Sequence, residues 1–144
     1  MAAKNGGEQM KSVWTVWMAG TLLSGVDGYQ VYQKHCMGCH VEMMEKKEVI
    51  RNLGNLKAPP MVEVSHRLKE NVMIADEDDD VKRRVIVAFV KDYVENPSIQ
   101  YSMCHPMAIE KFGIMPSLKG KLGEDERQAV AEWVYDRYEG ISFR

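Results

Sequence analysis

Five consecutive residues set the strongest limit on the fold of this chain: Cys36-Met37-Gly38-Cys39-His40. The pattern C-x-x-C-H is the attachment site of a c-type haem. In such a site the two thiols form thioether bonds to the haem vinyl groups, and the histidine is held beneath the iron as its proximal ligand. One helical turn at this spacing places both sulfurs at the edge of the macrocycle and the imidazole under its centre. The motif therefore predicts one covalently bound haem.

Cysteine pairs at this spacing have two other uses. A redox dithiol requires a preceding strand in a thioredoxin-like context, whereas residues 27–34 have the pattern of a helix. A zinc site requires a second pair of ligands. The candidate pair, Cys104-His105, would join Cys36 and Cys39 but would leave His40 without a role. Haem attachment uses all three motif residues and is favoured.

Composition narrows the class of protein further. The 144 residues suffice for one domain with one core. The formal net charge of -2 and the lack of a basic stripe argue against a nucleic-acid binder. Three cysteines are too few for a disulfide scaffold. The 11 methionines suit a core wrapped round a large flat ligand, because Met side chains adapt to irregular surfaces.

The N-terminus has the pattern of an export signal. Lys11 is followed by an apolar run over residues 13–23 and then by two small residues, the order found in secretory signals. The run is too short to span a bilayer comfortably, but a poor cleavage site leaves an uncleaved membrane tether open. We therefore divide the chain into a signal peptide or short N-terminal membrane tether, residues 1–25, and one domain, residues 26–144.

Apolar periodicity predicts helices and no convincing strand, which places the chain in the all-α class. The helix before the motif has Asp27 as a plausible N-cap and an apolar face that includes Tyr29 and Tyr32. Gly28 lies where a second helix could approach closely, although it could equally be a simple capping-region glycine. Further helices are expected over residues 61–72, 81–95 and 124–139, with weak helical character over 41–57 and a single turn over 107–112.

An acidic run, residues 76–80, precedes the longest expected helix. It lacks the spaced ligands, central Gly and terminal Glu of a calcium loop. Acidic side chains stabilise the positive end of a helix dipole, so the run is interpreted as a helix start. His66, off the apolar face of its own helix, is expected to be solvated rather than a ligand.

Ala58-Pro59-Pro60 predicts a stiff extended corner, because proline excludes the preceding residue from a helix. The carbonyl groups of this corner can accept hydrogen bonds. A metal-bound histidine usually donates its second ring N–H to such an acceptor. Pro59 or Pro60 is thus the expected partner of His40, and the proline pair can also start the helix that follows.

Met115 is the best candidate for the second axial ligand of the iron. It lies in an irregular segment, residues 113–118, that Pro116 stiffens just before the last helix. A thioether ligand raises the reduction potential of a haem and suits electron transfer.

These residues together make the chain resemble a class I cytochrome c. It is similar to the small bacterial periplasmic carriers and to the haem domains of the third subunit of cbb3 oxidases. The pattern Gly-x-x-x-Tyr-x-x-x-Cys-x-x-Cys-His of that family is matched by Gly28, Tyr32, Cys36, Cys39 and His40. Pro59-Pro60, Met115-Pro116 and the aromatic helix around residues 131–135 match its later features. The resemblance implies N- and C-terminal helices that cross near Gly28, with additional helices around one haem.

The chain departs from the family in two places. Residues 62–100 are inserted or expanded, and the Cys-His-Pro-Met stretch at 104–107 has no assigned counterpart. His105 or Met107 could compete with Met115 for the iron, or the stretch could pack over the haem edge. Cys104 is either a small buried hydrophobe or a thiol that forms an intermolecular disulfide.

The resemblance implies a carrier rather than an enzyme. It would pass one electron at a time between respiratory-type redox partners in the periplasm. The donor would be a quinol-oxidising complex or a dehydrogenase, and the acceptor a terminal oxidase or reductase. Nucleic acid is not an expected partner, and a membrane is one only if the N-terminal segment stays uncleaved.

Three other functions remain open from the sequence. The chain could be the haem subunit of a larger redox complex, a haem-based sensor of small ligands, or a module without haem. For a carrier, four lysines flank the motif and the Met115 segment: Lys34, Lys111, Lys119 and Lys121. They are either a basic rim that steers partners or scattered surface charges.

Overall fold

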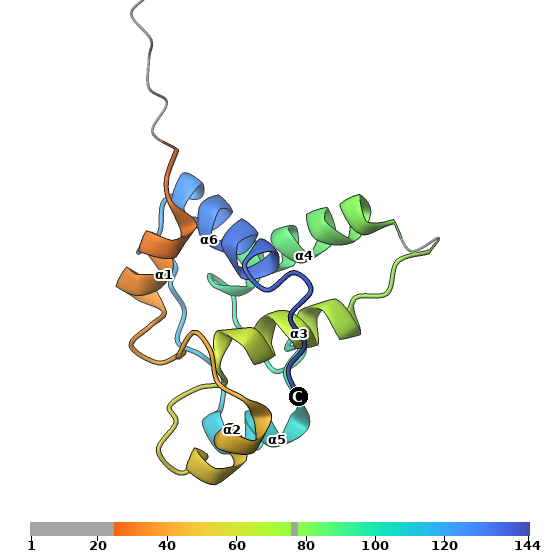
Figure 1. Ribbon diagram of the computed structural model, residues 1–144. Helices are drawn as coiled ribbons and strands as arrows, with labels where there is room; N and C mark the ends of the chain where they lie inside the picture. The colour runs from red at the N-terminus through yellow and green to blue at the C-terminus, as the bar shows by residue number, and fades with distance from the viewer. Residues whose placement is uncertain (1–24, 76–77) are drawn as a thin grey trace, which may run out of the picture.

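The computed structural model describes residues 25–75 and 78–144, so the expected signal or tether falls almost wholly outside the described residues. The described part is all-α, as the sequence predicts, and contains no strand. Six helices follow one another along it (Figure 1): α1 (Gly28–His35), α2 (Lys46–Asn52), α3 (Met61–Asn71), α4 (Asp79–Tyr93), α5 (Pro106–Phe112) and α6 (Glu124–Asp136). None of these helices is both long and apolar enough to cross a membrane.

Helix α1 packs across α6 through a contact that requires glycine. Asp27 caps α1, since its carboxylate accepts a hydrogen bond from Tyr29 N at 2.9 Å. A Cβ atom on Gly28 would lie 2.2 Å from the carbonyl oxygen of Ala129 in α6. The sequence left two roles open for Gly28, and the structure supports the close helix approach. The ring of Tyr32, fully buried, stacks on Trp133 of α6 at 4.5 Å between centroids.

Helix α6 is central, because it also packs against α4 and α3. Helices α4 and α6 are antiparallel, since Arg83 near the start of α4 pairs with Asp136 at the end of α6. At the opposite end Lys91 pairs with Glu124. Many buried side chains of the core come from these two helices and α3, and they include Val62, Leu68, Ile86, Val90, Val130 and Val134.

Helix boundaries differ from the predicted ones where side chains intervene. Helix α4 begins earlier than expected because Asp78, in the acidic run, accepts a hydrogen bond from Val81 N. Helix α6 ends at Asp136 rather than near Gly140. The carbonyl oxygen of Tyr135 accepts a hydrogen bond from Lys69 Nζ at 2.8 Å, and the following turn tightens, with Glu139 N donating to Asp136 O.

His66 is partly solvated, since 25% of its side chain is exposed, and it belongs to no group of residues that could hold a metal ion in the part of the chain that the structure describes. Its side chain is partly buried near Phe143, and its Nε2 pairs with Glu70.

Candidate haem site

The C-x-x-C-H motif forms a tight turn directly after α1. Cys36 caps the C-terminus of α1 through its backbone N–H, which donates to Tyr32 O. His40 N then donates to Cys36 O at 2.9 Å, which closes the turn. The hydroxyl of Tyr32 donates to the carbonyl oxygen of His40 at 2.7 Å and ties the end of the turn back to the helix. As a result Cys36, Cys39 and His40 all line one cavity.

The hydrogen bond expected for His40 is present. Its Nδ1 lies 2.7 Å from the carbonyl oxygen of Pro59, so Nδ1 donates and Nε2 keeps its lone pair. Pro60 is not the partner, because its carbonyl accepts Val64 N as the first hydrogen bond of α3. Met61 N donates to Val41 O at 2.8 Å, which holds the proline corner against the segment after the motif.

Burial controls the protonation of the motif side chains. Burial lowers the pKa of His40, although its hydrogen bond to Pro59 opposes this effect. The neutral imidazole that a metal requires is therefore favoured. Burial, with a smaller contribution from Cys39, raises the pKa of the Cys36 thiol to about 11. Cys39, by contrast, is exposed, so one edge of the motif faces solvent.

The cavity beside the motif has a volume of about 230 Å³ and mostly apolar walls. They come from the end of α1, from α3, α4, α5 and α6, and from the segments around residues 103–105 and 113–118. The walls include Val64 and Leu68 on α3, Phe89 and Val90 on α4, and Val130 and Val134 on α6. The inserted region thus supplies much of the cavity. Such a cavity can exclude water from a large flat ligand.

Of the proposed distal ligands, Met115 has the most suitable environment. It lines the cavity and packs against the core. Met107 does not line it, and its side chain is 66% exposed. His105 does line it, but its Nδ1 accepts a hydrogen bond from Met107 N at 3.2 Å. A neutral imidazole that accepts at Nδ1 carries its proton on Nε2, so His105 would have to give up this cap to bind a metal.

The ligands of the alternative zinc site are not gathered in the structure. Over residues 25–75 and 78–144, no group of three or more His, Cys, Asp or Glu side chains could hold a metal ion. Cys104 lies half-buried in the cavity wall, and burial raises the pKa of its thiol against an opposing hydrogen bond from Ser102. This position agrees with the interpretation of Cys104 as a small buried hydrophobe.

The cavity wall also contains polar atoms that lack a partner in the protein. Arg67 Nη1 pairs with Glu70 at 2.9 Å, but Arg67 Nε is buried and makes no hydrogen bond. His35 Nε2 is likewise buried and unpaired. Both residues line the cavity, so an acidic group of a ligand could accept from them. Arg67 is not among the site residues predicted from the sequence. A usable signal was its position three residues after Val64, on the same face of α3.

A crossed pair of terminal helices, a motif turn with an oriented histidine and a facing methionine around one apolar cavity define a c-type cytochrome. The chain belongs to the family described as cytochrome c oxidase, cbb3-type, subunit III, which matches residues 24–134. Membership implies haem c with iron as the cofactor and haem-based electron transfer as the activity.

The chain is also similar to an uncharacterized protein of Aquifex aeolicus (strain VF5). The two are 40% identical over 119 residues, which cover 77% of this chain and 73% of the relative. No solved structure matches the chain. The residues that line the cavity fit haem c, because they include two cysteines, a histidine whose Nδ1 is already hydrogen-bonded, a methionine, and an arginine whose buried Nε has no hydrogen-bond partner.

Proposed function

We propose that this protein is an exported single-haem cytochrome c that carries one electron at a time between redox proteins and has no enzymatic activity of its own. The observation that carries the proposal is the shared cavity. Cys36, Cys39 and His40 reach it from one chain segment and Met115 from another, with apolar side chains between them. A residue set that binds one redox cofactor and shields it from water suits electron transfer better than chemistry on a bound substrate.

Each of these residues has a distinct part in the proposal. Cys36 and Cys39 would form the two thioether bonds, and His40 and Met115 would be the proximal and distal iron ligands. Haem c supplies reversible one-electron chemistry at the iron when bound. Pro59 holds the ring of His40 through Nδ1. Arg67 would donate to a haem propionate through its unpaired Nε.

Replacement of Met115 by Ala tests the core of the proposal. Wild-type protein, produced with the haem-maturation system, is expected to be low-spin and to show the thioether-to-ferric-iron absorption band. Met115→Ala should lose that band and become able to bind carbon monoxide when reduced. Met107→Ala, at an exposed position outside the cavity, is the matched control and should keep the wild-type spectrum. Colourless wild-type protein, or a band that survives in Met115→Ala, would contradict the assignment.

Partner docking is proposed to use the basic rim, defined as Lys34, Lys111, Lys119 and Lys121. All four side chains are exposed, which supports an electrostatic role without requiring a positive net charge. Reversal of charge at Lys119 and Lys121 should slow electron transfer to the physiological partner and weaken its dependence on salt. Unchanged rates at every ionic strength would exclude the rim. The proposed site of this exchange is the periplasm, with residues 1–25 as the export signal or tether.

The family match also supports a second candidate, a haem subunit of a larger redox complex. The redox chemistry would be the same, but the protein would be bound permanently to other subunits. Mild extraction from the native cell followed by size-exclusion chromatography separates the two. A carrier elutes as a monomer, whose mass is 16.5 kDa for the full chain, increased by the haem and decreased by any cleaved signal peptide. A subunit elutes together with the rest of its complex.

A further inference from the structure

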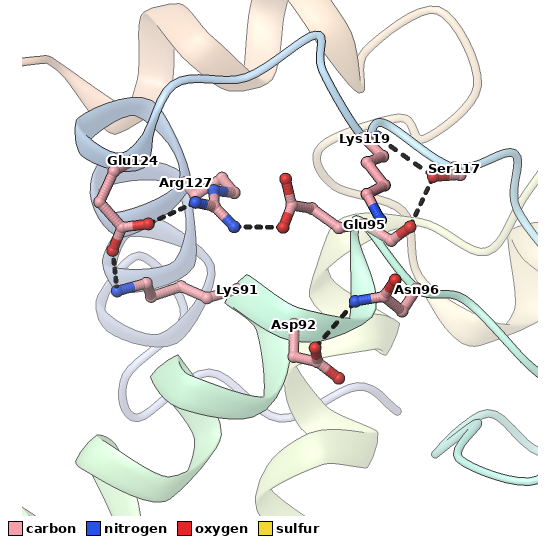
Figure 2. Close-up of polar contacts among 8 residues, drawn as sticks. All are labelled: Lys91, Asp92, Glu95, Asn96, Ser117, Lys119, Glu124 and Arg127. Carbon is pink, nitrogen blue, oxygen red and sulfur yellow. Dashed lines mark hydrogen bonds and ion pairs between the residues drawn. The ribbon is translucent and has the colours of Figure 1, made fainter.

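The segment that contains Met115 is attached to the end of α4 by hydrogen bonds. Leu118 N donates to the carbonyl oxygen of Val94 at 2.8 Å. The hydroxyl of Ser117 donates to the carbonyl oxygen of Glu95 at 2.5 Å (Figure 2). Both acceptors lie just after the last residues of α4, where helix carbonyls lack partners within the helix. The Met115 segment therefore supplies the missing donors.

The hydroxyl of Ser117 connects the Met115 segment to the end of α4. It also accepts a hydrogen bond from Lys119 N at 3.1 Å, so it fixes the turn that follows Met115 as well as the contact to α4. Leu118, next in the chain, is buried in the core. Met115 thus lies only two residues before a pair of anchored positions.

The end of α4 is in turn fixed to α6 by charge. The carboxylate of Glu95 pairs with the guanidinium of Arg127 in the first turn of α6. Arg127 also pairs with Glu124, which pairs with Lys91 of α4, as Figure 2 shows. The Glu95–Arg127 pair is the least exposed ion pair among the described residues, at 20% and 21% side-chain exposure. It is therefore screened less than a surface pair.

We propose that Ser117, Glu95 and Arg127 form a latch that positions Met115 for the iron. The inference rests on the proposed function, in which Met115 is the distal ligand. The latch residues do not touch the metal in this proposal. They hold the backbone of the Met115 segment in the conformation that presents the thioether to the cavity, so that little ordering is required when the ligand bond forms. The inserted region would thus contribute to the ligand strength of Met115 as well as to the cavity wall.

Competition with imidazole measures this contribution in the haem-loaded protein. Imidazole binds ferric iron only after Met115 leaves, so a weaker methionine ligand appears as a tighter apparent imidazole affinity. Ser117→Ala should increase that affinity roughly fivefold, the factor expected for the loss of one hydrogen bond. Ser117→Thr, which keeps a hydroxyl at this position, should have an imidazole affinity close to the wild-type value. The reduction potential of Ser117→Ala should fall, because the methionine ligand favours the ferrous state.

Ser98→Ala is the matched control for Ser117. The hydroxyl of Ser98 lies close to Glu95 in the chain but is buried without a hydrogen-bond partner. Its removal should leave imidazole affinity unchanged. If Ser117→Ala and Ser98→Ala give the same affinity, the latch is excluded.

The ion pair has a control of its own. Glu95→Gln should raise imidazole affinity about twofold. Asp136→Asn removes an ion pair between the same two helices at their far end, and should lower the unfolding temperature without a change in imidazole affinity. If Glu95→Gln and Asp136→Asn had equal imidazole affinities, the pair of Glu95 and Arg127 would have no part in positioning Met115. Wild-type protein without the thioether band would instead overturn the distal-ligand assignment, and the latch with it.

Discussion

The Nδ1 atom of His40 lies 2.7 Å from the carbonyl oxygen of Pro59, 19 residues further along the chain. The direction of this carbonyl depends on the ψ angle of Pro59, and the proline that follows restricts that angle to extended values. Pro60 therefore orients the acceptor, although Pro59 provides it. A hydrogen bond to the second ring nitrogen makes a histidine a more basic ligand.

The first prediction concerns this restriction. Pro60→Ala should loosen the carbonyl of Pro59, weaken the hydrogen bond and raise the reduction potential by about 20 mV, since a less basic histidine stabilises ferric iron less. Pro59→Ala is the control, because the acceptor and the restriction by Pro60 both remain. Spectroelectrochemical titration of the two variants measures the difference. A shift in Pro59→Ala as large as that in Pro60→Ala would argue against this division of roles.

The second prediction tests the crossing of α1 and α6. Gly28→Ala would place a Cβ atom 2.2 Å from Ala129 O and 2.6 Å from Trp133 Cβ, and a backbone carbonyl cannot yield as a flexible side chain can. The free energy of unfolding should fall by about 1–3 kcal/mol. Gly54→Ala, with no atom within 4 Å of the added carbon, should change it little. Denaturant unfolding of both variants gives the comparison, and equal stabilities would show that the helices adjust without cost.

The sequence predicts those features that depend on nearby residues. The cap at Asp27, the turn at the motif and the proline corner follow from local chemistry, and all three are present. The role of Gly28 could not be decided from the sequence, because it depends on the backbone of Ala129 in the last helix. The place of Arg67 in the cavity wall could not be predicted either, because the cavity forms only when several distant helices pack together.

Contacts between distant segments explain the remaining differences. Helix α6 ends earlier than predicted, at the point where Lys69 on α3 donates a hydrogen bond to the carbonyl oxygen of Tyr135. The hydrogen bond from Ser117 to Glu95 joins two loops, and neither loop has a sequence pattern that predicts contact with the other. Neither contact has a periodic or motif signature, because each depends on how whole helices pack. The sequence predicts the motif, the Met115 segment and the helix that becomes α4, but the packing of α4 against α6 and its place in the cavity wall are visible only in the fold.

The third prediction concerns Arg67. Its Nε is buried in the cavity wall without a partner, and a fixed cation near the iron favours the reduced state. Arg67→Gln should lower the reduction potential by on the order of 50 mV. Arg67→Lys keeps the charge and should lower the potential less. Arg51→Gln, in exposed α2 and outside the cavity, controls for loss of a surface charge. If Arg67→Gln and Arg51→Gln lowered the reduction potential equally, the effect would follow net charge alone. A specific contact between Arg67 and the haem would then be ruled out.

The last prediction concerns stability against acid. Arg83 donates two hydrogen bonds to Asp136, at 2.8 and 2.6 Å, and these lower the pKa of that carboxyl below its ordinary value against the opposing effect of burial. Because the folded pKa is the lower one, the pair stabilises the fold at any pH above the unfolded value, near pH 4. This contribution is lost as the pH falls through the folded pKa.

Thermal unfolding of wild-type protein and Asp136→Asn across pH measures this loss directly. The wild-type protein should unfold at the higher temperature from about pH 5 upward, and the gap should close as the pH falls from about 4 through the lowered pKa of the folded Asp136 carboxyl. Both side chains are partly exposed, so added salt should also narrow the gap at neutral pH. If the gap persisted undiminished at the lowest pH, the stabilisation would come from the packing of the Asp136 side chain, because an ion pair cannot survive loss of the negative charge.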